Sequence, residues 1–357
     1  MKRKSLTHQL SAAFAILACA VITLLFGSAT IRAQSGDRST VLNVASLGGQ
    51  LDEVFKKAFR PFEDQNKITI HWTPGVSAEN LTKVAASRSN PEFDVALVEN
   101  LGQYSGSTQG LWAKVDESIV TNYKDLYPQG RSRNNDAVGI GFFLAGFFYR
   151  TDEFEKRGWA PPKSWNDLFR PEFCGRLGIQ HPNVSYTIHT IIMLAGGDVT
   201  KVNDGIARLA KLKDCITVLE PSAPKLEEKI QLGEYLVGIH GNIRTVYLIK
   251  KGYPIKFVYP EEGTVVGVTM AAAVKNAPNA QLAQKFLNWF IRPDVQQQVM
   301  EGLFYGPTNR NVVVSEVMKQ YGVPDSELMK KMITIDDSVI VSQRRNWVRQ
   351  TERALSK

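Results

Sequence analysis

Residues 137–149 read AVGIGFFLAGFFY, an apolar stretch that contains Gly139, Gly141 and Gly146 and has a charged residue at each end. Each glycine inside a helix costs about 1 kcal/mol relative to alanine, so three of them argue against a helix here. We interpret the stretch as the place where the chain leaves a first lobe as β-strands and enters a second.

The residues before this stretch alternate between strand and helix patterns. Val41–Ser46 is a short, mostly apolar run that leads through a tight turn at 47–49 into an amphipathic helix at 51–62. The pattern repeats, with strands expected at 68–72 and 94–98 and a helix at 81–88. This alternation predicts a largely parallel sheet covered by helices.

The same alternation resumes after the stretch. Strands are expected at 176–180, 215–219, 236–240 and 255–259, and helices at 186–195, 225–232 and 242–250. The β-rich segment Thr264–Val274 is expected to return to the first lobe. A chain of 357 residues also exceeds the roughly 250–300 residues that one core supports. The predicted fold class is therefore α/β with two lobes, the first formed by 38–142 and 269–312 and the second by 143–268 and 313–357.

The first 33 residues are expected to lie outside the fold. A basic start at residues 2–4 precedes an apolar run of 15 residues from Ala12 to Phe26, and small residues follow. This is the pattern of a secretory signal peptide, cleaved after Ala29 or Ala33, which sends the chain to the periplasm. The alternative, a retained membrane anchor, is disfavoured because a membrane span requires about 20 apolar residues.

The charge balance gives no reason to expect nucleic-acid binding. The net charge of the whole chain is +8, and it falls to +4 without the four basic residues of the predicted signal. Near the end of the chain, one solvated helix face is expected to carry the basic residues Arg344, Arg345, Arg349 and Arg353.

The motif content does not indicate an enzyme. His71, His181, His189 and His240 show no metal-ligand spacing, and neither a phosphate-binding loop nor a Gly-x-Ser-x-Gly motif is present. We therefore expect no catalytic residues, no metal and no cofactor.

Two cysteines, Cys174 and Cys215, remain after removal of the predicted signal. Each lies at or just before the start of a predicted strand of the second lobe. Because the periplasm oxidises thiols, we predict a disulfide between them.

Short segments spread over nearly all of the mature chain occur in a characteristic order. They are NPEFDVA at 90–96, SWNDLFRPE at 164–172, CGRLGI at 174–179, GE at 233–234, YPEEG at 259–263, and KFLNWF with RPDV at 285–295. In this order they resemble bacterial extracellular solute-binding family 1, whose members are type II periplasmic binding proteins of ABC transporters. The resemblance implies two lobes that are joined by crossover strands and close on a ligand.

The ligands of the known branches of this family do not carry over directly. The polyamine branch supplies a Trp and an Asp where this chain has Gly267 and Thr269, which removes the main charge and cation–π contacts for an amine; Thr269 is kept as a candidate ligand contact. The ferric-iron branch has a Tyr pair where this chain has Asn242 to Arg244, and an arginine repels iron. Polyamine, iron and thiamine binding remain alternatives.

Ligands of open α/β sheets bind beyond the carboxyl ends of strands, so the turns that follow strands are candidate sites. In the first lobe, the turn with Ser46, Gly48 and Gly49 presents N–H groups that favour carboxylate or phosphate oxygens. Glu99 and Asn100 follow another strand, where an acid could take a ligand amine. The alternatives are an ordinary tight turn for the first and a solvated loop or an interlobe hydrogen bond for the second.

The second lobe has similar candidates. Ser185 and Tyr186 open a helix after a strand, although Ser185 could act only as a cap. Asn242 and Arg244 begin another helix, where an arginine opposes the helix dipole unless a bound anion or a salt bridge compensates it. Tyr149 ends the crossover stretch and is expected either to form a wall of the site or to lie in the core.

We therefore expect a monomeric periplasmic substrate-binding protein of an ABC importer. It would capture a small polar organic solute, either an anion or a zwitterion, that carries a carboxylate or phosphate and deliver it to a membrane permease. The ligand would bridge the Ser46–Gly49 turn and Arg244 from opposite lobes in the closed state. The alternative is a periplasmic enzyme or sensor domain on this scaffold, because a fold does not establish a function.

Overall fold

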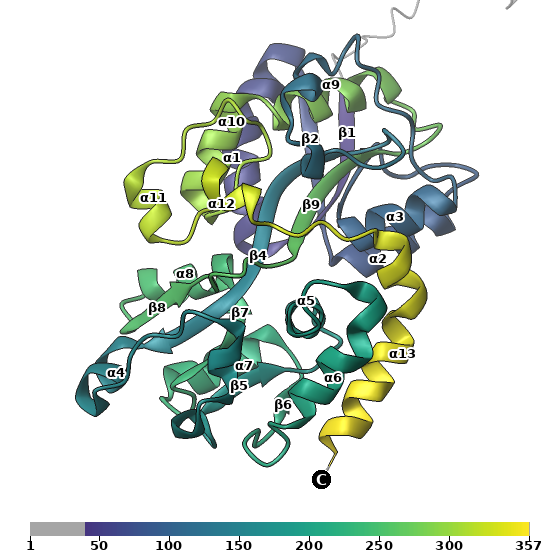
Figure 1. Ribbon diagram of the computed structural model, residues 1–357. Helices are drawn as coiled ribbons and strands as arrows, with labels where there is room; N and C mark the ends of the chain where they lie inside the picture. The colour runs from purple at the N-terminus through teal and green to yellow at the C-terminus, as the bar shows by residue number, and fades with distance from the viewer. Residues whose placement is uncertain (1–39, 357) are drawn as a thin grey trace, which may run out of the picture. The chain divides into compact units, whose positions relative to one another are not determined.

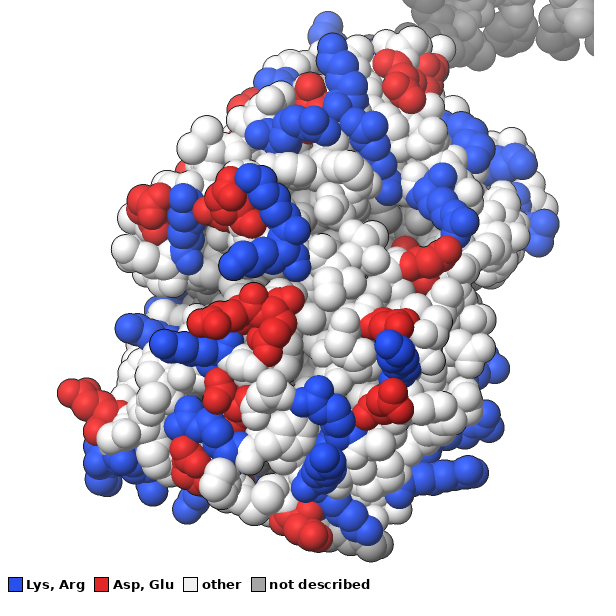
Figure 2. All heavy atoms as spheres, in the orientation of Figure 1, with Lys and Arg blue, Asp and Glu red and all other residues white. Residues whose placement is uncertain are grey.

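The computed structural model describes residues 40–356, so the predicted signal peptide lies outside the described residues. Its strands follow one path in the order β2-β1-β3-β9-β4-β7-β5-β6, and β8 pairs with β4 (Figure 1). No helix within residues 40–356 is long and apolar enough to cross a membrane. Basic and acidic side chains are mixed over the face drawn in Figure 2.

The strand β4, Val138–Arg150, belongs to both lobes. Its first part pairs with β9 (Val266–Ala273), and its second part pairs with β7 (Val237–Gly241) and β8 (Ile255–Val258). All of these pairings are antiparallel. The predicted crossover is therefore one continuous strand that is shared by the two lobes.

The glycines of β4 allow other groups to approach the strand closely. A Cβ on Gly141 would lie 2.5 Å from Cγ of Tyr305, and a Cβ on Gly146 would lie 2.5 Å from Cζ of Phe257. Both neighbours are aromatic rings, so a larger residue at either position would have to displace a ring.

The first lobe is a sheet covered by helices. β1 (Thr40–Ser46) pairs in parallel with β2 (Ile68–Pro74) and β3 (Val95–Glu99), and β9 runs antiparallel to β3. The helices that accompany this sheet are α1 (Gly49–Asn66), α2 (Ser77–Ala86), α3 (Asn100–Thr108), α9 (Ala280–Phe290) and α10 (Pro293–Leu303).

An aromatic cluster fills the core of the first lobe. Phe55, Phe59 and Phe62 recur at helical spacing on α1 and are buried against Phe286 and Phe290 of α9. The rings of Phe59 and Phe286 stack with centroids 4.3 Å apart. The predicted apolar face of α1 is therefore the face that holds this helix on the sheet.

The second lobe repeats the arrangement. Its sheet contains the second part of β4 with β5 (Leu177–Gln180), β6 (Leu219–Glu220), β7 and β8. Its helices are α4 (Thr151–Arg157), α5 (Ser185–Leu194), α6 (Val202–Ala210), α7 (Ala223–Gln231), α8 (Asn242–Lys250) and α13 (Asp337–Leu355).

The strand expected at 215–219 is wrong, because only its last residue, Leu219, belongs to β6. The N–H groups of Cys215 and Ile216 both donate to the carbonyl of Leu212. The chain is therefore still turning out of α6 where an extended strand was predicted.

The C-terminal part of the chain crosses between the lobes later than expected. Residues 313–332, which include α11 (Glu316–Gln320) and α12 (Ser326–Lys330), were assigned to the second lobe, but Met329 and Met332 are buried in a core cluster of the first lobe. Two backbone hydrogen bonds hold Ile333 to the segment that leads into β9. The crossing to the second lobe follows at 333–337, and Figure 1 shows this segment passing β9 toward α13.

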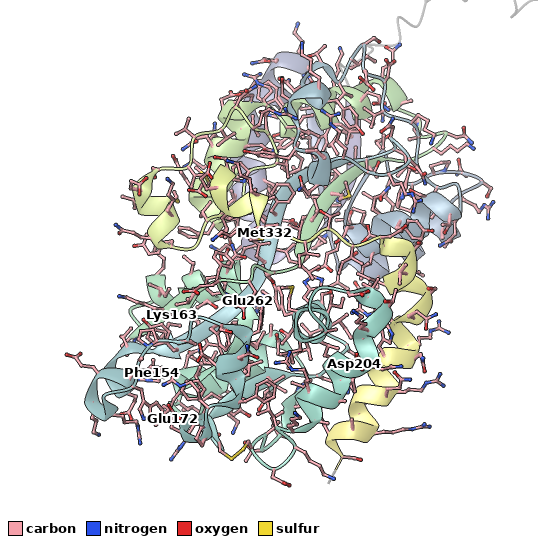
Figure 3. The ribbon with its side chains drawn as sticks, viewed as in Figure 1. Phe154, Lys163, Glu172, Asp204, Glu262 and Met332 are labelled. Carbon is pink, nitrogen blue, oxygen red and sulfur yellow. A yellow bond between two sulfur atoms is a disulfide. The ribbon has the colours of Figure 1, made fainter. Side chains whose placement is uncertain are left out.

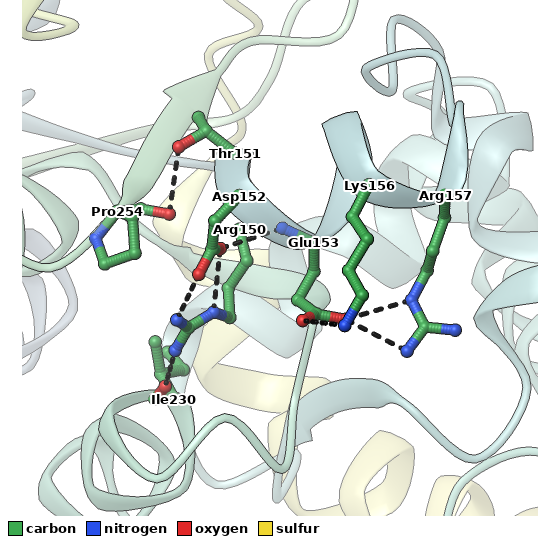
Figure 4. Close-up of polar contacts among 8 residues, drawn as sticks. All are labelled: Arg150, Thr151, Asp152, Glu153, Lys156, Arg157, Ile230 and Pro254. Atoms are coloured by element: carbon green, nitrogen blue, oxygen red, sulfur yellow. Dashed lines mark hydrogen bonds and ion pairs between the residues drawn. The ribbon is translucent and has the colours of Figure 1, made fainter.

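The far end of β4 is tied to the second lobe by Arg150 (Figure 4). Its guanidinium donates to both carboxylate oxygens of Asp152 and to the carbonyl of Ile230 on α7. The N–H of Thr151 donates to the carbonyl of Pro254, ahead of β8. The shared strand is thus anchored to α4, α7 and β8 at the end distant from the first lobe.

The expected pair Cys174 and Cys215 forms a disulfide in the second lobe, with Cα atoms 4.3 Å apart. Figure 3 shows it as a yellow bond, and shows Glu262 and Lys163 near the centre of the same view. The Glu262 carboxylate accepts from the hydroxyl of Ser164, which caps the turn after Lys163. The disulfide joins segments that are separated by 41 residues.

Replacing both cysteines by serine should lower the free energy of unfolding by about 2–4 kcal/mol, because the disulfide restricts the unfolded chain. Guanidinium unfolding of the oxidised protein and of the double variant measures the difference. A reducing agent should destabilise only the protein that keeps both cysteines. Equal stabilities would contradict the prediction.

Candidate ligand-binding site

The end of β3 and the middle of β9 place two polar side chains where the first lobe meets the second, and Tyr305 adds a third. Glu99, the last residue of β3, is paired in register with Thr269 of β9, so the two side chains share a face of the sheet. The hydroxyls of Thr269 and Tyr305 lie 2.9 Å apart. Glu99 also influences the titration of Tyr305, whose pKa is raised chiefly by burial.

Tyr186, at the start of α5, lies between the lobes. Its ring contacts Phe143 of β4 and His240 of β7, with centroids 6.1 Å apart in both cases, and it packs against the cores of both lobes. Gly241 makes this position possible, because a Cβ there would lie 2.2 Å from the Tyr186 hydroxyl oxygen. The predicted candidate Tyr186 therefore stands at the centre of the interlobe region.

The Glu99 carboxyl has no direct partner in the described part of the protein. Among residues 40–356 its carboxylate oxygens make no hydrogen bond and no ion pair; its N–H donates to Ser77. Burial raises the pKa of the Glu99 carboxyl, and the Arg344 guanidinium partly opposes that shift. An amine placed beside this carboxylate would satisfy it.

Arg344 of α13 is the counterpart of Glu99 in the second lobe. Its guanidinium donates to the carbonyl of Asn183, just before α5. Burial lowers the pKa of Arg344, while the charge of Glu99 raises it. The expectation of a solvated helix face was wrong for Arg344, although Arg345, Arg349 and Arg353 are exposed.

The sequence contains a signal that could have identified Arg344. Ile340, Trp347, Val348 and Thr351 are buried on α13, and Arg344 follows Ile340 by four residues and precedes Trp347 by three. Residues at this spacing share a helix face. A basic residue inside the apolar stripe is the feature that distinguishes Arg344 from its neighbours.

The turn after β1 already uses its polar groups internally. The Ser46 hydroxyl donates to the Asp52 carboxylate at 2.6 Å, and the Gly48 N–H donates to the other carboxylate oxygen at 3.0 Å. Gly48 and Gly49 have positive φ angles of 73° and 59°, which glycine adopts without strain. Asp52 of the first turn of α1 thus occupies the anion position that we expected a ligand to fill.

Asn100 and Asn242 make structural hydrogen bonds. Asn100 donates to Asp337 at the start of α13 and accepts from the Val268 N–H, which is the interlobe bond considered as the alternative. Asn242 is fully buried, accepts from the Leu144 N–H of β4 and donates to the carbonyls of Phe304 and Gly322. Both side chains therefore already have partners within the protein.

Arg244 is compensated by a side chain of its own lobe. Its Nε donates to Glu227 of α7, which also contacts His240 at 3.3 Å. Burial raises the pKa of Glu227, but His240 and Arg244 outweigh this and leave it lowered. The unfavourable interaction between the Arg244 charge and the helix dipole is therefore compensated by a salt bridge, which was the alternative to a bound anion.

The two remaining candidates differ in position. Tyr149 is buried in the core of the second lobe, where its ring lies 4.8 Å from that of Phe154, so it is a core residue. Ser185 is half-buried as the first residue of α5, and its side chain does not cap the helix. Ser185 stays beside Tyr186 at the interlobe face.

Two buried histidines line the second-lobe side of this region. Burial lowers the pKa of His189 on α5 to about 3, and the charge of Arg344 contributes to the shift. Burial also lowers the pKa of His240, which the contact with Glu227 partly offsets. Within residues 40–356, no group of three or more His, Cys, Asp or Glu side chains could hold a metal ion.

A two-lobed α/β chain with a polar site between its lobes is the architecture of a binding protein. The sequence matches the family model of bacterial extracellular solute-binding proteins over residues 57–324. The chain belongs to this family, as the sequence motifs indicated, and members of the family bind solutes and are not enzymes.

Curated relatives bind small amines or amino acids, according to their names. The chain is 27% identical over 242 residues to the spermidine/putrescine-binding periplasmic protein of Escherichia coli, a match that covers 62% of this chain and 66%, just under two thirds, of the relative. It is 26% identical over 304 residues to the gamma-aminobutyric acid-binding protein of Pseudomonas aeruginosa, which covers 81% of this chain and 82% of the relative.

Solved structures show the same fold. An ABC transporter substrate-binding protein from Bradyrhizobium japonicum superposes with a TM-score of 0.75 at 22% identity, over 89% of this chain and 100% of that chain. An ABC transporter protein from Clostridium perfringens gives 0.75 at 21% identity, over 89% and 100%. The predicted type II periplasmic-binding-protein fold is confirmed.

The depressed pKa of His189 predicts acid sensitivity. The folded protein keeps this ring neutral down to about pH 3, whereas an unfolded histidine takes up a proton near pH 6.5. The stability linked to His189 is therefore present above pH 6.5 and is lost as the pH falls toward 3, which amounts to about 2 kcal/mol at pH 5. His189→Leu should reduce the difference in unfolding free energy between pH 7 and pH 5 by about this amount.

The exposed His71 of β2 provides the control. His71→Gln should leave the pH dependence of the unfolding free energy unchanged. If His189→Leu showed the same loss of stability between pH 7 and pH 5 as the unsubstituted protein, the buried histidine would not be its source.

Proposed function

We propose that this chain is the periplasmic solute-capturing component of a bacterial ABC importer and delivers its ligand to a membrane permease. We further propose that the ligand is a small zwitterion with an ammonium group and a carboxylate group. The observation that carries the second proposal is the presence, within the described residues, of one carboxylate without a direct partner, Glu99, and one half-buried guanidinium, Arg344, on opposite lobes.

The charges of the site discriminate between ligand classes. A zwitterion would place its ammonium beside Glu99 and its carboxylate beside Arg344, where a charge-assisted hydrogen bond can be bidentate. A dicarboxylate would bring a second negative charge to Glu99, and a diamine would bring a second positive charge to Arg344. Each of these ligands would leave one charge of the site opposed by a like charge.

The expected ligand was a small organic anion or a zwitterion, and we keep the zwitterion but move its binding partner. The sequence pointed to a carboxylate- or phosphate-bearing solute held by the Ser46–Gly49 turn and Arg244. In the structure the Asp52 carboxylate accepts the hydrogen bond of the Gly48 N–H group, and the Glu227 carboxylate accepts that of Arg244. Arg344 remains as a cation whose charge acts on Glu99, and the name of the Pseudomonas aeruginosa relative supports an amino acid as the ligand class.

Such a ligand would couple binding to closure. Glu99 belongs to the first lobe and Arg344 to the second, so only the closed arrangement offers both contacts at once. The ligand would then shift the population of states by its differential affinity for the closed form. Delivery to a permease would follow from that closed state.

A polyamine remains the second candidate, and Glu99 is the observation in its favour. Its carboxylate is an acceptor that suits an amine, and the Escherichia coli relative is named for spermidine and putrescine. The same site lacks a second free carboxylate opposite Glu99, because Glu227 is engaged by Arg244 and His240.

Thermal unfolding with three straight-chain probes tests the ligand class. Gamma-aminobutyric acid at one hundred times its dissociation constant should stabilise the protein by about 2.7 kcal/mol, whereas putrescine and succinate should give much smaller shifts. Glu99→Gln and Arg344→Gln should each abolish the shift. The matched controls Glu92→Gln and Arg345→Gln change exposed residues of the same types and should retain it.

The remaining outcomes separate the alternatives. Stabilisation by putrescine alone would replace the zwitterion with a polyamine and leave the solute-binding role intact. A shift that survives Arg344→Gln but is lost in Arg244→Ala would restore the original assignment of the ligand carboxylate.

A further inference from the structure

A cavity lies on the opposite face of β9 from the candidate site. Successive side chains of a strand point to opposite faces, so Gly267 and Thr269 face the interlobe site while Val266, Val268 and Met270 line the other side. There they border a pocket of about 300 Å³. Its walls come from α3, the loop at 128–134, and the segment 334–337 that crosses to α13.

In the α3 wall Gln103 and Ser107 already use their hydrogen-bond donors, whereas the hydroxyl of Tyr104 has no partner among the described residues. Nε2 of Gln103 donates to Asp136 at 2.6 Å and to Ser107 at 2.8 Å, and the Ser107 and Ser132 hydroxyls donate to Asp136 as well. Gln103 is 4% exposed. Among the described residues its Oε1 has no hydrogen-bond partner, so this wall offers an acceptor to the pocket.

Both arginines that line the pocket already have partners, although Nε of Arg131 is buried without one among the described residues. The Arg131 guanidinium donates to the carbonyls of Lys124 and Leu126 and lies over the ring of Tyr123. Arg133 forms an ion pair with Asp336 at 2.5 Å. Neither guanidinium compensates the other carboxylates of the pocket.

Two carboxylates at the pocket therefore lack a cation. Asp136 lies beneath the α3 wall, is 4% exposed, and receives its side-chain hydrogen bonds from neutral groups. Asp337 is half-buried and receives a side-chain hydrogen bond from Asn100. Burial raises the pKa of Asp337 to about 6, and the neighbouring Asp336 adds to the shift while Asn100 opposes it.

We propose that this pocket is a second binding site, for a small organic cation in which an ammonium group is attached to a compact apolar body. The ammonium donates to the Asp337 carboxylate and to Oε1 of Gln103. The apolar body lies on Val266, Val268 and Met270. The acceptors and the apolar surface are complementary to such a molecule, because an ammonium group has only donors to offer.

The chemistry excludes an anion from the same pocket. An anion would be repelled by Asp336 and Asp337, which lie in one wall. To bind Arg133, it would have to break the ion pair between Arg133 and Asp336. An uncharged apolar molecule of the same shape would leave Asp337 without a compensating charge. The ammonium group is thus the feature on which the specificity of this pocket depends.

Titration calorimetry with cyclohexylammonium and cyclohexanecarboxylate, which share a ring and differ in charge, tests the proposal. The full chain without other ligands should bind the cation and not the anion. Asp337→Asn keeps an oxygen that can accept from Asn100 but removes the charge, and it should weaken binding about tenfold or more. Glu99→Gln, on the other face of β9, should bind the cation as the unsubstituted protein does.

The methyl NMR signals of Val268 and Met270 give a readout that does not depend on a variant. They should shift on addition of cyclohexylammonium and stay in place on addition of cyclohexanecarboxylate. Unchanged methyl signals at saturating cation would overturn the proposal. So would a loss of cation binding in Glu99→Gln combined with its retention in Asp337→Asn, because the amine would then occupy the interlobe site.

Discussion

The fold depends on how β4 changes partners at the junction of the lobes. Up to Leu144 this strand pairs with β9 of the first lobe, and from Ala145 it pairs with β7 of the second. The Leu144 N–H is satisfied at this junction by the Asn242 side chain, which also holds the carbonyls of Phe304 and Gly322. A buried N–H without a partner costs about 1–3 kcal/mol. Asn242 therefore lets one strand serve two sheets and ties α8 to the first lobe.

The polar residues around the interlobe region fall into two groups. Asp52 and Glu227 are matched by groups of their own lobe, by Ser46 with Gly48 in one case and by Arg244 with His240 in the other. Such pairs stabilise the local structure and leave few unused hydrogen-bonding groups for a ligand. Among the described residues Glu99 and Arg344 form no ion pair, and our proposal of a zwitterion rests on their opposite signs and on their presence on different lobes.

Much of the fold could be predicted because strands and helices follow from local periodicity. The helix at Asn242–Lys250 begins and ends where expected, and the glycines of 137–149 correctly indicated strand structure. The strand prediction at 215–219 was wrong because hydrogen bonds to the preceding helical turn hold its backbone. Such a contact does not affect the periodicity of the apolar residues. The last crossing between the lobes was predicted too early in the chain, because Met329 and Met332 pack against strands that are distant in sequence.

The candidate site was harder to predict than the fold, for a physical reason. A glycine turn or an arginine at a helix start indicates an unsatisfied group, but it does not show whether the protein itself supplies the partner. Asp52 lies only six residues after Ser46, yet its role is visible only in three dimensions. Arg344 was missed because the helix was assigned to the surface on account of its many basic residues. The sequence nevertheless places Arg344 in the stripe of α13 that is buried.

The position of Arg344 along the chain has a consequence for biosynthesis. All strands of both sheets precede residue 274, whereas α13 begins at Asp337. Proteins are synthesised from the N-terminus, so every one of these strands has been made before Arg344 is added. The site that we propose for the ligand therefore lacks one of its two charges until α13, the last helix, docks.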